Sequence, residues 1–244
     1  MLEETSYNDT ILVKLTRDNV AIVEAMIRND SAYIRATDST AAPEYNNKNE
    51  IKYGGSSAYW MTHLKRVLVD EGGESWYPYE EIIKGAVESV DRENSTHINA
   101  DKCGRKETTD RICRFDRSEL LSCLRDPDYN QMGLIREIMR RTSAEKGARC
   151  NLSFASKFCH YACFYVFEGT AYQDNYSIYD GVIKSVLPLY LGYYHIKRDY
   201  DLDDYKEYRV AVDRVRAAAG IEISRNGFDH LLWYYHKGRK RNSA

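Results

Sequence analysis

The stretch SFASKFCHYACFYVF, residues 153–167, is the most informative segment for the fold class. It is strongly apolar and aromatic, and it contains neither glycine nor proline. An uninterrupted apolar segment of this length exceeds an ordinary buried strand and is typical of a buried helix. The sequence therefore predicts a helix over 154–167.

Helical patterns extend outward from this segment in both directions. Apolar residues recur at helical spacing, whereas no alternating strand series and no internal repeat is found. The further helices are expected at 16–28, 57–70, 78–91, 118–126, 131–145, 181–194, 203–219 and 225–237. Thr16 or Asp18, Asp180 and Ser224 suit N-caps, and Gly220 suits a stop. The fold class predicted from these patterns is all-α.

Two polar stretches interrupt the helical patterns. Residues 36–56 are rich in small and turn-forming residues and predict a long exposed loop. Residues 92–112 have little apolar periodicity, so they are interpreted as a connection between lobes or as an irregular surface insertion. The expected organisation is one compact helical domain over 1–244, with sub-lobes at 1–112 and 113–244.

Composition favours a globular protein inside the cell. Of the 244 residues, 43% are hydrophobic and 30% are charged, which lies near globular averages. The first ten residues lack the pattern of a secretory signal, and no stretch approaches about 18 uninterrupted apolar residues. We expect a cytoplasmic protein without a membrane segment.

The net charge of −2 argues against a protein that coats nucleic acid, although a local basic face is compatible with this net charge.

The cysteine pattern predicts neither a disulfide framework nor a metal site. The six cysteines are scattered, and without a secretory signal we expect reduced thiols. Three of them, Cys103, Cys113 and Cys123, recur every ten residues, but no CxxC or HxxxH pair completes a zinc or iron–sulfur spacing. No metal and no cofactor is therefore predicted.

A basic region precedes the apolar helix. The segment GARCNLS, 147–153, joins it to a helix rich in arginine, and backbone N–H groups at the start of the second helix suit a phosphate. The candidate DNA-binding residues are Arg136, Arg140, Arg141, Lys146, Arg149 and Ser153. The alternative is a solvated basic face without a ligand.

Two charged residues are candidates for catalysis. Lys157 is a lone cation among aromatic and small residues, where desolvation favours the neutral, nucleophilic amine. The alternative is a surface lysine whose stem packs on the helix. Asp180 follows 23 residues later in YSIYDGVIKSVLPLY, where its carboxylate could stabilise a developing cation or simply cap a helix.

The segments LSFASKFCHYACF and SIYDGVIKSVLP resemble the helix-hairpin-helix DNA glycosylases, especially the oxoguanine glycosylase/lyase branch. The resemblance covers about 130–190 and extends toward FDHLLWYYHKG near the end. ARCNLS replaces the family's glycine-rich hairpin turn, so the motif is degenerate here. The iron–sulfur cysteine loop of one family branch is absent.

The resemblance implies a two-lobed helical bundle with a cleft between the lobes, which binds duplex DNA containing a damaged or modified base. The base would be flipped out of the duplex, because its glycosidic bond is otherwise unreachable. Lys157 would attack the sugar, Asp180 would stabilise the positive charge, and the Schiff base would permit strand cleavage. The pocket candidates are His230, Trp233 and His236.

Two other classes of function remain open from the sequence. One is a non-catalytic DNA-binding or defence-associated module, which the altered hairpin favours. The other is an all-helical protein-interaction domain, which the acidic segment DYDLDDYKEY, 199–208, favours.

Overall fold

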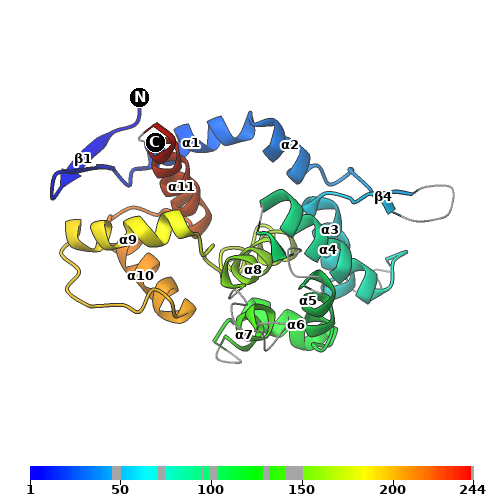
Figure 1. Ribbon diagram of the computed structural model, residues 1–244. Helices are drawn as coiled ribbons and strands as arrows, with labels where there is room; N and C mark the ends of the chain where they lie inside the picture. The colour runs from blue at the N-terminus through cyan, green and yellow to red at the C-terminus, as the bar shows by residue number, and fades with distance from the viewer. Residues whose placement is uncertain are drawn as a thin grey trace. The chain divides into compact units, whose positions relative to one another are not determined.

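Helices make up most of the described chain, which confirms the all-α class (Figure 1). The computed structural model describes residues 1–45, 51–70, 75–94, 96–98, 104–128, 132–140 and 151–242. Two short antiparallel hairpins accompany the helices in these ranges.

The chain divides into two units. The terminal unit combines Met1–Asp30 with Ser177–Ala244, and the central unit is Ser31–Tyr176. The sub-lobe boundary expected at 112/113 falls inside the central unit, between two of its helices.

The terminal unit begins with a hairpin that the sequence patterns did not reveal. Strands β1 (Glu4–Tyr7) and β2 (Thr10–Val13) pair through a tight turn at Asn8 and Asp9, both with positive φ. Asn and Asp tolerate this conformation better than most residues. The buried Asn19 on α1 (Arg17–Arg28) bonds the carbonyls of Glu3 and Lys14, each at 2.9 Å. A side-chain amide thus holds the hairpin ends to the helix.

Three long helices complete the terminal unit. They are α9 (Gly181–Tyr193), α10 (Tyr205–Ala218) and α11 (Arg225–Asn242). Helix α11 packs against α1 and α9, and α10 packs against α9 (Figure 1). The N-cap role expected of Thr16 is confirmed, since its side chain accepts from the Asn19 amide. Gly220, at φ +70°, follows the end of α10 as predicted.

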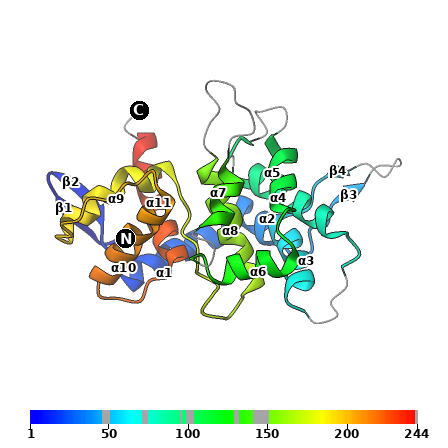
Figure 2. The same cartoon turned by 90° about the horizontal axis from the view of Figure 1, so that it is seen from below.

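The central unit is built around α8 (Leu152–Val166), which matches the helix expected at 154–167. Helix α8 contacts α3, α4, α6 and α7, so most of its residues are buried (Figure 2). This packing on several sides explains its nearly continuous apolar sequence. The remaining elements are α2 (Ser31–Thr37), β3 (Glu44–Tyr45), β4 (Ile51–Tyr53), α3 (Ser57–Leu68), α4 (Tyr79–Asn94), α5 (Gly104–Ile112), α6 (Arg117–Arg125) and α7 (Gly133–Met139).

Both polar stretches contain regular structure, which corrects their interpretation as loop and irregular insertion. Helix α2 and the β3–β4 hairpin occupy part of 36–56, and α5 occupies 104–112. The charge-rich α5 is held by a tertiary contact: the buried Asp91 accepts from Arg105 Nε at 2.8 Å and from the Ile98 amide at 3.0 Å. A long-range ion pair of this kind leaves no periodic signal in the sequence.

Candidate functional site

Lys157 lies in the second turn of α8, close to the helix start as the sequence indicates. Its neighbours Ser156 and Phe158 are buried, whereas Lys157 itself is only partly covered. Its Nζ lies 3.4 Å from Oγ of Ser153, one turn earlier. One turn later, the Tyr161 hydroxyl donates to Asn94 Oδ1 at 3.0 Å. Lys157 thus lies on the polar edge of a mainly buried helix.

Asp180 is the N-cap of α9, which confirms the capping prediction. Its backbone is extended, and Oδ1 accepts the amide N–H of Val182 at 2.7 Å. The carbonyl of Asp180 accepts the first helical bond, from Lys184 at 2.8 Å. The carboxylate is therefore held in one orientation at the positive end of the helix dipole.

Lys157 belongs to the central unit and Asp180 to the terminal unit. The local position of each residue is fixed by its own helix. Their joint placement in one cleft stays a prediction.

The candidate DNA-binding residues divide into two groups. Arg136 and Arg140 are exposed on α7 and at its C-terminal end, and Ser153 lies beside Lys157. Arg140 pairs with Glu137 at 2.9 Å, which offsets part of its charge. Arg141, Lys146 and Arg149 lie outside the described residues, as do residues 147–150 of the predicted hairpin. Helices α7 and α8 pack against each other.

The three base-pocket candidates lie on α11 in different surroundings. His230 and Trp233 are partly exposed, and Nζ of Lys237 lies 3.9 Å from the centroid of the Trp233 ring. His236 is buried, with Nε2 3.1 Å from the hydroxyl of Tyr190. That hydroxyl bonds the carbonyl of Val13 at 3.0 Å, so His236 takes part in the core of the terminal unit.

The described residues contain neither a membrane-spanning helix nor a cluster of metal ligands. No helix among them is long and apolar enough to cross a bilayer. Within the same ranges, no three His, Cys, Asp or Glu side chains gather closely enough to hold a metal ion.

No family model, curated protein or solved structure matches this chain.

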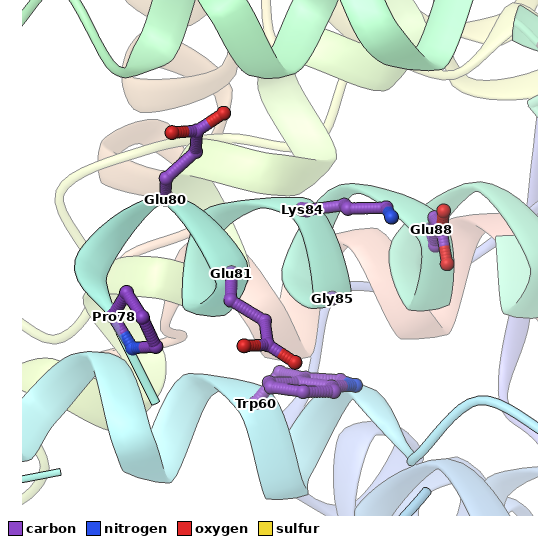
Figure 3. Close-up of a pocket in the computed structure, with 7 residues that line it drawn as sticks. All are labelled: Trp60, Pro78, Glu80, Glu81, Lys84, Gly85 and Glu88. Carbon is purple, nitrogen blue, oxygen red and sulfur yellow. The ribbon is translucent and has the colours of Figure 1, made fainter. Parts of the chain in front are cut away.

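The structure adds one site that the sequence analysis missed, a cavity of 270 Å³ between α3 and α4 in the central unit (Figure 3). Its lining residues are Trp60, Pro78, Glu80, Glu81, Lys84, Gly85 and Glu88. The acidic residues in PYEEIIKGAVE, 78–88, are the sequence feature that could have indicated this cavity. The same pattern is equally typical of a helix face exposed to solvent.

Proposed function

We propose that this protein is a DNA glycosylase with associated lyase activity, which acts inside the cell on a damaged or modified base flipped out of duplex DNA. The proposal includes a degenerate helix-hairpin-helix formed by α7, the connection after it and α8. It also includes the two-lobed arrangement that the resemblance implies. The order of Lys157 and Asp180, their spacing and their flanking apolar segments support it.

The observation that carries the proposal is the setting of Lys157. It is the single lysine on α8, and it lies at the edge of a buried aromatic helix with one hydroxyl, that of Ser153, within 3.4 Å. A lysine amine at the edge of a packed helix is placed to act as a nucleophile toward a group that reaches that edge.

The proposed reaction forms and breaks defined bonds. Nζ of Lys157 attacks C1′ of the nucleotide with its lone pair, and the glycosidic C–N bond breaks. The base leaves with the bonding electrons and takes up the proton that the newly bonded amine releases. Opening of the sugar ring gives a Schiff base between Nζ and C1′. Loss of a proton from C2′ then expels the 3′ phosphate by β-elimination.

Asp180 is assigned an electrostatic role in this reaction. The sugar develops positive charge as the base departs, and a carboxylate fixed in advance stabilises that charge without reorganising. Its hydrogen bond to the Val182 amide supplies the required rigidity. The basic residues around α7 and α8 are assigned to the DNA phosphates, so binding should weaken as salt rises.

The test is base release by the purified protein. Duplex oligonucleotides carrying 8-oxoguanine, uracil, an alkylated purine or no lesion are incubated with the protein, and binding and released base are measured separately. Release from at least one modified duplex supports the proposal. Salt-sensitive binding without release would favour the non-catalytic DNA-binding module, and absence of binding would contradict both.

A further inference from the structure

The cavity between α3 and α4 lies wholly within the central unit, and one of its lining residues is a glycine, Gly85. Trp60 of α3 is buried and lies against Gly85 of α4. A Cβ at Gly85 would come within 2.2 Å of the indole atoms Cδ2 and Cε2, so no larger residue fits there without displacement. The close approach of the two helices places the acidic face of α4 beside an aromatic ring.

The wall of the cavity carries excess negative charge. Its lining contains three carboxylates, those of Glu80, Glu81 and Glu88, and one cation, Lys84. Among the residues that the structure describes, no ion pair involves any of these three carboxylates. The excess charge favours a cation over an anionic or purely apolar ligand.

Tyr45 lies near the Glu81 carboxylate. Partial burial first, and then the neighbouring Tyr77 and Glu81, raise the pKa of Tyr45 to about 12, so its hydroxyl is neutral at physiological pH. Figure 3 shows the Glu81 side chain turned toward the indole of Trp60 and Lys84 extending toward Glu88.

An exposed tryptophan lies next to the cavity in the sequence. Trp76, two residues before Pro78, is 93% exposed. Tryptophan is enriched among residues that dominate binding at protein interfaces, and full exposure is unusual for it. We expect an extended ligand instead of a free small molecule, because an exposed tryptophan lies close in sequence to a helix that carries several carboxylates. The volume of the cavity, below the usual range for drug-sized ligands, fits one side chain.

We infer that this cavity binds an arginine side chain from a basic segment of a partner protein, with Trp76 packing on the same segment. Arginine fits better than lysine because its planar guanidinium can engage carboxylates with two parallel hydrogen bonds, and because it stacks on an exposed aromatic ring such as Trp76. The surface is acidic, so it differs from the basic face assigned to DNA, and the inference does not depend on the proposed glycosylase activity.

Fluorescence anisotropy with labelled hexa-arginine and hexa-lysine peptides tests the inference on the full chain. We expect hexa-arginine to bind more tightly than hexa-lysine at physiological salt. Glu81→Gln, Glu88→Gln and Trp76→Ala should each weaken hexa-arginine binding about tenfold, as is common for central contacts at an interface. Lys84→Gln should strengthen it, because it removes the competing cation.

The matched control is Glu119→Gln on α6. Glu119 is exposed, and its substitution changes the net charge by the same amount as the cavity variants. Hexa-arginine affinity that falls equally in Glu119→Gln, or that is unaffected by Glu81→Gln and Trp76→Ala, would overturn the inference. Circular dichroism of each variant distinguishes a lost site from a lost fold. Lys157→Gln should leave peptide binding unchanged, which separates this test from that of the glycosylase.

Discussion

The hydroxyl of Tyr190 lies 3.1 Å from Nε2 of His236, and it also bonds the carbonyl of Val13 at 3.0 Å. A carbonyl only accepts, so the hydroxyl donates to Val13 and accepts from Nε2–H of His236. One phenol therefore joins α9, α11 and β2. All three groups are buried, so water cannot replace either bond.

Tyr190→Phe should destabilise the protein by about 1–3 kcal/mol, because it leaves a buried carbonyl and a buried imidazole N–H without their partner. Chemical denaturation measures the change. Tyr234→Phe on α11 is the matched control, since no hydrogen bond of its hydroxyl appears among the described residues. Equal stability of the two variants would contradict this role for Tyr190.

Glu93 should make stability depend on pH. Its carboxylate accepts from the Ser57 amide at 3.1 Å and from Ser57 Oγ, but burial is the larger influence and raises the pKa of Glu93 above its ordinary value of 4.5. The folded state thus binds the proton more tightly than the unfolded state. The stability that protonation provides is present below pH 4.5 and is lost as pH rises through the folded pKa.

Glu93→Gln tests this linkage, because glutamine keeps an acceptor for Ser57 and does not titrate. The stability of Glu93→Gln relative to the unmodified protein should rise as pH increases from about 4 to 7. Denaturation at several pH values measures it. A relative stability that falls over the same window would mean that the hydrogen bonds and Arg92 outweigh burial.

The sequence predicted most of the helices and some of their ends, but not the tertiary hydrogen bonds between them. Local signals were sufficient for the helices, because an N-cap such as Asp180 or a stop such as Gly220 acts within a few residues. The bond between Tyr190 and His236 joins residues 46 apart, so neither residue could be assigned its partner in advance.

The candidate site shows the same limit. The positions of Lys157 and Asp180 at helix starts followed from local periodicity and capping. The cavity could not be predicted, because it requires Trp60 and Gly85 from two helices to meet. Helix α5 was missed because its stabilising contact, between Arg105 and Asp91, is tertiary.

Gly85→Ala should destabilise the protein although alanine is the better helix former. The helical gain is about 1 kcal/mol, whereas a Cβ within 2.2 Å of Trp60 requires repacking that typically costs about 1–3 kcal/mol. Gly181→Ala is the control, since a Cβ there meets nothing within 4 Å. A double variant, Gly85→Ala with Trp60→Phe, should recover part of the loss measured by thermal denaturation. No recovery would mean that Trp60 is not the obstacle.

Substitutions of Asp180 should separate its capping role from its proposed chemical role. Asp180→Asn keeps an acceptor for the Val182 amide and should retain nearly full stability, whereas Asp180→Ala should lose about 0.5–2 kcal/mol. If the carboxylate also stabilises the developing cation, base release by Asp180→Asn should be slower by about 100-fold or more. Single-turnover release measures this, and a normal rate in Asp180→Asn would restrict Asp180 to capping.

We propose that Nζ of Lys157 forms a covalent bond with the sugar of a modified nucleotide. Borohydride reduction of the reaction converts a Schiff base into a stable amine, and peptide mass spectrometry of the trapped adduct identifies the residue that carries it. We expect the unmodified protein to be trapped on modified duplex, with the adduct on Lys157. Lys157→Gln should form no adduct, yet keep its fold and much of its DNA binding. Lys184→Gln controls for another lysine, and it should be trapped normally. An adduct that persists in Lys157→Gln, or one that maps to Lys184 or to the N-terminal amine, would contradict the account.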